Sequence, residues 1–101
     1  MNPQQMMQQA RKLQAQLAKI REELGQETVT GSAGSGAVQV TLTGHGTLTG
    51  VRIDKSAVDP EDVETLEDLI AVAFKDAQKK VQDVSQERMA PLAGGLGLPG
   101  F

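Results

Sequence analysis

The lysine and arginine residues are the ones in this sequence best suited to a functional role. The role that fits them is ionic contact with phosphate. The first 21 residues contain Arg11, Lys12, Lys19 and Arg21 but no Asp or Glu, although the whole chain has a formal net charge of -3. The dipole of a helix disfavours positive charge near its N-terminus. The basic start therefore indicates an anionic partner, since helix stability alone does not explain it.

A second group of cationic residues follows in the C-terminal half, in a segment predicted to be helical. Lys75 and Lys79 are four residues apart and therefore share one face of that helix, which we expect to point outward. Lys80 and Arg88 fall nearer to the side that the apolar pattern predicts to be packed. Acidic residues precede the lysines on the outer face, and the helix dipole by itself favours that order. The positions of Lys75 and Lys79 therefore fit two interpretations, contact with phosphate or a solvated helix face.

The residues needed for catalysis or metal binding are missing from the sequence. There is no cysteine, and His45 is the only histidine, so neither a thiolate site nor a histidine-rich metal site can form. His45 lies between two glycines, which indicates a turn, and it has no nucleophile or carboxylate partner. Asp59, Glu61 and Asp62 have the spacing of a helix start. We predict no enzyme activity, no catalytic or metal site, no cofactor and no small-molecule substrate.

A long helix is predicted to carry the basic start. Asn2 and Pro3 suit the N-cap and the first helical position, and Gly25 suits the position after the last helical residue. Between them, apolar residues recur at the steps of a heptad repeat: Met6, Ala10, Leu13, Leu17, Ile20 and Leu24. The stripe is typical of packing on a sheet or of pairing with another helix, and its first turns favour pairing because they would extend beyond a small sheet.

Residues 27–53 have the pattern of three strands. The runs ETVT, AVQVTLT and TLTGVRI are rich in Val and Thr, and apolar and polar residues alternate in the second. Gly50 displaces the alternation of the third run by one place, which a β-bulge would restore. The run GSAGSG lies between two strands and lacks a following lysine, so it favours a flexible hairpin loop over a phosphate-binding loop. We predict an antiparallel meander with one apolar face.

The segment VDPEDV predicts the start of a second helix, with Asp59 as N-cap and Pro60 at the first helical position. The apolar pattern continues to about Met89. Glycine and proline are dense in residues 91–101, which predicts a flexible tail. The predicted fold class is therefore α+β, with the order α-β-β-β-α, a three-stranded antiparallel sheet and a single domain of residues 1–90.

Two features predict an oligomer whose helices extend beyond the sheet. Aromatic residues are 2% of the 101 residues, so large side chains contribute little to the core. Small domains with thin cores rely on disulfides, metals or a second subunit. Because the sequence has no cysteine and one histidine, a second subunit is the support that remains. The two helices would run about 33 Å and 45 Å at ~1.5 Å per residue, whereas strands of this kind span roughly 17–24 Å. The helices would thus extend beyond the sheet, and their apolar stripes need cover, either from each other or from a second chain.

Duplex DNA is the partner that best fits these features. The chain has no Tyr or Trp, which argues against stacking on single-stranded bases, whereas scattered cations suit contacts to a duplex backbone. The candidate DNA-binding residues are Arg11, Lys12, Lys19, Arg21, Lys75, Lys79, Lys80 and Arg88. No signal peptide or membrane-spanning run is visible, so we expect a cytoplasmic protein. The alternative is a protein-interaction module that uses the heptad helices without binding DNA.

Three segments, taken in order, resemble the YbaB/EbfC family of bacterial nucleoid-associated proteins. They are REELGQETVTGSAGSGAVQVTLTG, VRID and EDLIAVAFKDAQKKVQDVSQERM, and the resemblance covers nearly the whole chain. It implies an α-β-β-β-α homodimer that binds double-stranded DNA through projecting helices, mostly with low sequence preference, in the nucleoid and in a context of chromosome organisation. By position it also implies basic roles for Lys19, Lys79, Lys80 and Arg88.

Overall fold

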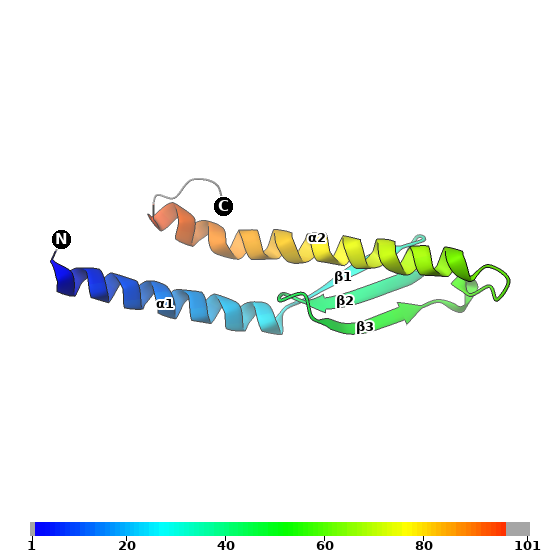
Figure 1. The fold of residues 1–101 in the computed structure, drawn as a ribbon, viewed down its shortest axis with the longest axis horizontal. Helices are drawn as coiled ribbons and strands as arrows, with labels where there is room; N and C mark the ends of the chain where they lie inside the picture. Colours follow the sequence, from blue (N-terminus) through cyan, green and yellow to red (C-terminus); the bar gives the residue numbers. More distant parts are fainter. Residues whose placement is uncertain (1, 97–101) are drawn as a thin grey trace.

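The computed structural model describes residues 2–96, which form an elongated molecule with extents of 70 × 23 × 16 Å (Figure 1). Its radius of gyration is 19.3 Å, compared with roughly 13 Å for a compact chain of about 100 residues. The elements are α1 (Pro3–Gln26), β1 (Thr28–Ala33), β2 (Val38–Thr43), β3 (Leu48–Ile53), the short 3₁₀ helix η1 (Lys55–Ala57) and α2 (Val63–Leu96). The predicted order α-β-β-β-α is confirmed.

Helix α1 begins as the sequence predicts and ends two residues later. Asn2 is the N-cap, and its side-chain oxygen accepts a hydrogen bond from the backbone N–H of Gln5 at 2.8 Å. Gly25 lies inside the helix, which ends at Gln26, so its predicted position after the helix was wrong. A Cβ at Gly25 would lie 3.1 Å from the ring of His45. Glycine at this position therefore lets the turn after β2 approach the helix closely.

The three strands form an antiparallel sheet in the order β1-β2-β3. Thr41 pairs with Gly50 and Leu42 pairs with Leu48, which leaves Thr49 as an extra residue in β3. The β-bulge predicted beside Gly50 is therefore confirmed. It returns the apolar side chains of β3 to the face that carries the buried side chains of β2.

The hairpin between β1 and β2 is tighter than predicted. Residues 31–33, which the sequence assigns to a loop, belong to β1. The turn itself comprises residues 34–37, and positive φ angles at Gly34, Ser35 and Gly36 explain why it is rich in glycine. The remaining glycine of the run, Gly31, is buried in β1 and serves the packing of α2.

Helix α2 packs on one face of the sheet, over β1 and β2 (Figure 1). The buried core is small: Ala33, Val38, Val40, Leu42, Ala73 and Ala77. A Cβ built on Gly31 would lie 2.2 Å from the carbonyl oxygen of Ala73 and 2.3 Å from the backbone nitrogen of Ala77. Glycine and alanine thus allow the helix backbone to lie directly on the strand backbone.

The start of α2 differs from the prediction. The side chain of Asp62 accepts hydrogen bonds from the backbone N–H of Thr65 at 3.3 Å and from its hydroxyl at 2.6 Å. Asp59 instead accepts a bond from the N–H of Glu61 at 2.9 Å, within a turn that precedes the helix. The predicted N-cap was therefore wrong by three residues, because both aspartates can satisfy free backbone N–H groups and the local pattern does not distinguish them.

The end of α2 also differs. The helix continues through Pro91 to Leu96, whereas the apolar pattern predicts an end near Met89. Proline removes one intrahelical hydrogen bond and glycines follow at positions 94 and 95, so the local propensities favour the earlier end that the sequence predicts. The predicted boundary after residue 90 thus falls within α2, and residues 97–101 of the predicted tail lie outside the described residues.

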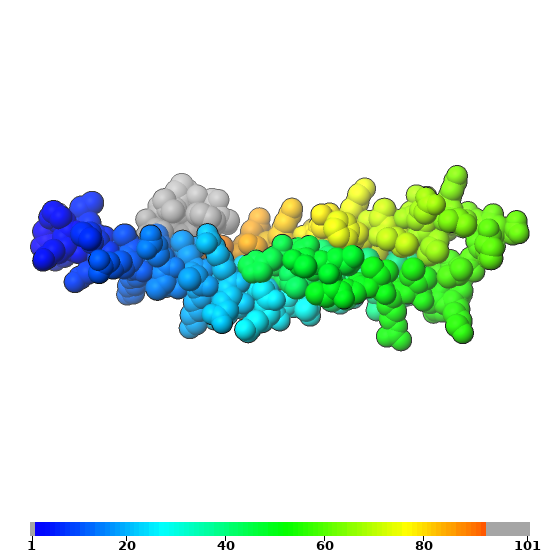
Figure 2. All heavy atoms as spheres, turned by 60° about the horizontal axis from the view of Figure 1, so that its bottom comes forward, coloured from blue at the N-terminus to red at the C-terminus, as the bar shows by residue number. Residues whose placement is uncertain are grey.

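Helix α1 projects from the body and does not pack on the sheet. In the space-filling view its N-terminal turns extend as a rod beyond the body (Figure 2), and Leu24 is its only buried residue. Met6 and Met7 near its start are 58% and 55% exposed. The apolar stripe of α1 is therefore not a sheet-packing stripe in this chain. Neither helix within residues 2–96 has the apolar length that a membrane crossing requires.

Candidate nucleic-acid interface

The cationic side chains of α1 lie on the projecting part of the helix. Arg11, Lys12, Lys19 and Arg21 are all exposed, and within the described residues none of them forms an ion pair. The first turn of α1 contains no acidic residue. Their charges therefore make the potential positive along a rod about 36 Å long at ~1.5 Å per residue, and the helix dipole adds to it at the free end.

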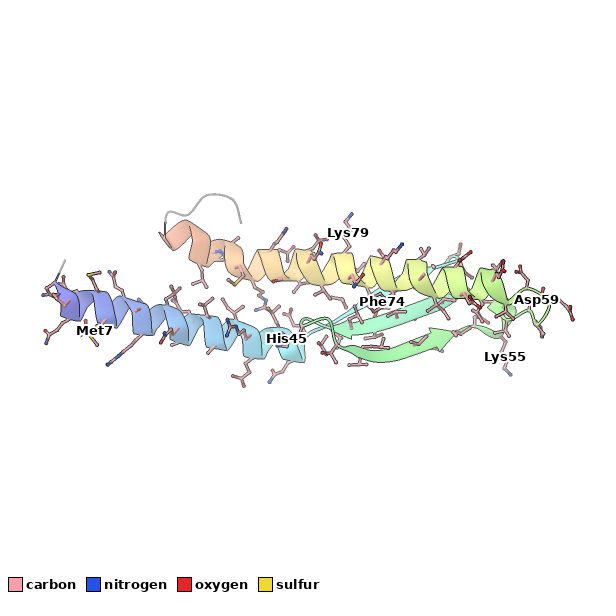
Figure 3. The ribbon with its side chains drawn as sticks, viewed as in Figure 1. Met7, His45, Lys55, Asp59, Phe74 and Lys79 are labelled. Atoms are coloured by element: carbon pink, nitrogen blue, oxygen red, sulfur yellow. The ribbon has the colours of Figure 1, made fainter. Side chains whose placement is uncertain are left out.

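The cationic side chains of α2 face a different direction. Lys79 points away from both the sheet and α1 (Figure 3), and Lys75 lies one turn earlier on the same face. Both side chains are exposed. The structure therefore does not gather the cations of α1 and α2 into one patch on a single chain.

Lys80 has partners within its own chain. Its Nζ donates a hydrogen bond to the carbonyl oxygen of Thr30 in β1 at 2.7 Å and lies 3.5 Å from a carboxylate oxygen of Asp76. The same oxygen of Asp76 accepts a bond from the backbone N–H of Ser32 at 3.0 Å. This bond, with the nearby Lys80 ammonium, holds the pKa of Asp76 below its usual value. Lys80 and Asp76 thus attach α2 to the edge of β1.

Arg88 also has intramolecular partners. Its Nη1 lies 2.8 Å from a carboxylate oxygen of Glu23, and its Nη2 contacts the carboxylate of Glu27. Arg88 belongs to α2, whereas Glu23 lies in the last turns of α1 and Glu27 directly follows that helix. The prediction that Arg88 lies towards the packed side is confirmed, and the side chain joins the two helices where they come together.

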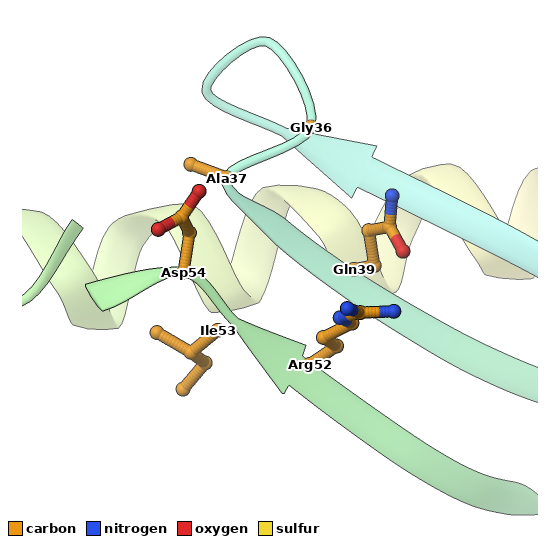
Figure 4. Close-up of a pocket in the computed structure, with 6 residues that line it drawn as sticks. All are labelled: Gly36, Ala37, Gln39, Arg52, Ile53 and Asp54. Carbon is orange, nitrogen blue, oxygen red and sulfur yellow. The ribbon is translucent and has the colours of Figure 1, made fainter. Parts of the chain in front are cut away.

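The opposite end of the molecule is acidic and has no predicted DNA contact. Asp59 lies at this end, in the turn before α2, and Lys55 lies nearby (Figure 3). A hollow of about 410 Å³ opens at the same end of the sheet, lined by Gly36, Ala37, Gln39, Arg52, Ile53 and Asp54 (Figure 4). Its lining mixes a guanidinium with a carboxylate, so it offers no net positive charge for phosphate. The described residues contain no cluster of three or more potential metal-ligating side chains.

An apolar surface on β3 is the feature that the sequence reasoning missed. Leu48, Val51 and Ile53 are 52%, 47% and 38% exposed, and we call these three side chains the β3 apolar face. They pair with the buried Leu42, Val40 and Val38 of β2, so they point to the side where α2 lies. Because α2 covers only β1 and β2, they have no helix above them. The sequence signal was present: one covering helix is narrower than three apolar strands.

Comparisons with known proteins give one consistent result. The model of the YbaB/EbfC DNA-binding family matches residues 1–96. A nucleoid-associated protein of Roseiflexus sp. (strain RS-1) is 50% identical over 101 residues, covering 100% of both chains. A nucleoid-associated protein of Corynebacterium glutamicum is 50% identical over 93 residues, covering 92% of this chain and 90% of the relative. The crystal structure of the uncharacterized protein HP0035 from Helicobacter pylori has a TM-score of 0.75 at 25% identity, covering 95% of this chain and 97% of that one.

Proposed function

The chain belongs to the YbaB/EbfC DNA-binding family, and on that premise we propose that it binds double-stranded DNA as a homodimer, without catalysis, in the bacterial nucleoid of the cytoplasm. Binding would rest on contacts between cationic side chains and the phosphate backbone and would show low sequence preference. The observation that carries this proposal is the projecting helix α1, whose exposed charges before Glu22 are all positive. Such a rod suits a polyanion because nothing in the body covers it.

We propose that the DNA contacts come from those cationic side chains of α1 and α2 that are exposed and have no ion-pair partner among the described residues. They are Arg11, Lys12, Lys19 and Arg21 on α1, and Lys75 and Lys79 on α2. Lys80 and Arg88 were predicted from the sequence to join them. Because both already neutralise carboxylates of their own chain, we propose that they support the two helices instead.

The β3 apolar face supports the homodimer. Its side chains point to the layer occupied by α2, so whatever covers them must lie beside α2 in that layer. A helix from a second copy meets this requirement, and two-fold symmetry would cover both β3 apolar faces at once. Among the described residues, the buried cluster between α2 and the sheet contains one side chain larger than valine, Leu42, which is why added apolar burial would stabilise the fold. In such a dimer the number of cationic arms doubles.

Replacement of Val51 by threonine tests the interface. The change keeps the shape of the side chain but places a hydroxyl in the proposed apolar contact, and we expect the dimer dissociation constant to rise about tenfold. Sedimentation equilibrium over a range of protein concentrations measures it. Val58→Thr makes the same chemical change on a side chain that is 51% exposed and outside the β3 apolar face. Equal dimer affinity of the two variants would contradict the proposed interface.

Salt dependence tests the DNA-binding proposal. Binding of a fluorescent random-sequence duplex, followed by anisotropy at two salt concentrations, should weaken steeply as salt rises, because each phosphate contact contributes about -0.9 to the slope of log K against log salt. A duplex of different sequence should bind within a few-fold of the first. Absence of duplex binding at low salt, together with capture of a specific protein through α1, would favour the protein-interaction module instead.

A further inference from the structure

Helix α1 is attached to the body at one end only. Leu24, in its last turns, is the one buried residue of the helix. The backbone N–H of Gly44, in the turn after β2, donates hydrogen bonds to the carbonyl oxygens of Leu24 at 2.9 Å and Glu27 at 3.0 Å. A Cβ at Gly44 would lie 2.3 Å from the carbonyl oxygen of Leu24. This backbone contact fixes where α1 leaves the body, but a single point of attachment leaves the direction of a rod open.

Arg88 supplies a second point of attachment, on α2. Its two terminal nitrogens contact two different carboxylates, those of Glu23 and Glu27. Glu27 is the C-cap residue of α1, and its backbone N–H still donates a hydrogen bond to the carbonyl oxygen of Glu23 at 3.1 Å, so the two side chains lie one above the other on the side that meets α2. A guanidinium is planar and presents its donors in a fixed fork. Holding one carboxylate on each side of the fork therefore restrains rotation of α1 about its attachment as well as its distance from α2.

The charges at this junction also explain why Arg88 contacts the two glutamates rather than a phosphate group. Its side chain is 37% exposed, as is that of Glu23, and the side chain of Glu27 is 34% exposed. Withdrawing the guanidinium would leave two partly buried carboxylates close together without a cation, and like charges at this spacing repel. Arg88 is therefore retained by two anions of its own chain before any external anion competes for it.

We propose that Arg88 is a positioning residue that sets the direction of α1 relative to α2 and thereby the arrangement of the cationic arms. This inference rests on the proposed function only for its consequence in DNA binding; the geometry of the arm is a property of the protein alone. An arm held in one direction loses less conformational entropy when it meets a duplex than an arm that swings freely. Arg88 thus contributes to affinity without touching the DNA.

The direction of the arm can be measured directly, because the chain has no cysteine of its own. Spin labels attached through Gln14→Cys on α1 and Gln82→Cys on α2, both exposed positions, report the distance between the helices by pulsed electron spin resonance. Labelled chains diluted into an excess of unlabelled chains give the distance within one chain. Arg88→Gln should broaden the distance distribution, and Arg88→Lys, which loses the fork, should broaden it less.

DNA binding of the same variants separates positioning from contact. Arg88→Gln should weaken duplex binding about threefold, the scale of exposed ion pairs, with the salt slope of the parent protein retained. The exchange of Glu23→Arg with Arg88→Glu should restore both the narrow distribution and the affinity. Arg52→Gln removes the same charge from the outer face of the sheet and should change neither the distribution nor the affinity.

Two results would overturn the inference. One is an Arg88→Gln distribution as narrow as that of the parent. The other is a salt slope reduced by about one in Arg88→Gln with no recovery in the charge exchange, because that result identifies Arg88 as a phosphate contact. Failure of the parent protein to bind duplex DNA would contradict the proposed function, and the distance measurement on the protein alone would still decide the role of Arg88 in directing α1.

Discussion

Replacing Lys12 and Lys79 together by alanine is expected to lower the affinity for random-sequence duplex DNA at ~0.1 M salt by about 60-fold for each chain of the dimer that contacts the duplex. A phosphate contact with a slope of about -0.9 contributes roughly eightfold between 1 M and 0.1 M salt, and the two lysines of one chain therefore contribute about 60-fold. One lysine lies on each of the two helices, so the pair tests both. Anisotropy titrations across a salt series give the affinity and the slope, whose magnitude should fall by about two for each chain that contacts the duplex.

A charge-matched control separates contact from net charge. Arg52→Ala with Lys55→Ala removes two exposed cations from the other end of the molecule and leaves the same net charge as the first variant. We expect nearly unchanged affinity and slope, because charges beyond a Debye length of about 10 Å are largely screened at this salt. If the two double variants lost affinity equally, the overall charge and not the arms would govern binding.

Replacing Gly31 by alanine is expected to lower the free energy of unfolding by about 3 kcal/mol, at the upper end of the usual effect of overpacking. The added Cβ would meet backbone atoms of Ala73 and Ala77 at 2.2 Å and 2.3 Å. Backbone atoms cannot rotate away as the end of a side chain can, so α2 must move off β1. Urea denaturation followed by circular dichroism measures the loss. In a domain of marginal stability it reaches a large fraction of the total.

Gly50→Ala is the matched control for this effect. Gly50 lies in β3, and a Cβ built on it meets no atom within 4 Å. Its φ angle is not positive, so alanine introduces no backbone strain there. We expect the free energy of unfolding to change by less than about 1 kcal/mol. A loss as large as that of Gly31→Ala would show that the close approach of α2 to β1 is not what selects glycine.

The elements of the fold were predictable because they depend on local patterns. Alternation of Val and Thr predicts the strands, and the interruption at Gly50 predicts the bulge that the pairing confirms. The ends of the helices were less predictable, because several residues compete for the same role. Asp59 and Asp62 can both cap a helix, and the choice of Asp62 depends on the turn that Asp59 forms first.

The roles of individual cations were only partly predictable. All eight candidates are basic residues on helices, and their helical phase alone placed Lys80 and Arg88 towards the packed side. The sequence does not show which group of the same chain each cation contacts. Arg88 and Glu23 are 65 residues apart, and their contact depends on α2 running back over the sheet to the end of α1 (Figure 1). The place where α1 leaves the body is fixed by the backbone contact between Leu24 and Gly44, residues that carry no charge.

The β3 apolar face shows a different limit. Leu48, Val51 and Ile53 have the pattern of a core strand, and the pattern is correct because they point to the same side as the buried residues of β2. Whether such a face is covered depends on the width of the layer above it, which no local pattern records. A single helix reaches two strands, so the apolar face of the third strand stays exposed in the single chain.

The measurement that tests this account most directly maps the surface that duplex DNA touches. Backbone amide and side-chain NMR signals of the labelled protein, recorded with increasing amounts of random-sequence duplex, should shift mainly in residues 8–22 of α1 and around Lys75 and Lys79 of α2. Signals of the turn that contains Asp59 should stay unchanged. Shifts concentrated on the outer face of the sheet, with α1 unaffected at saturation, would contradict the account.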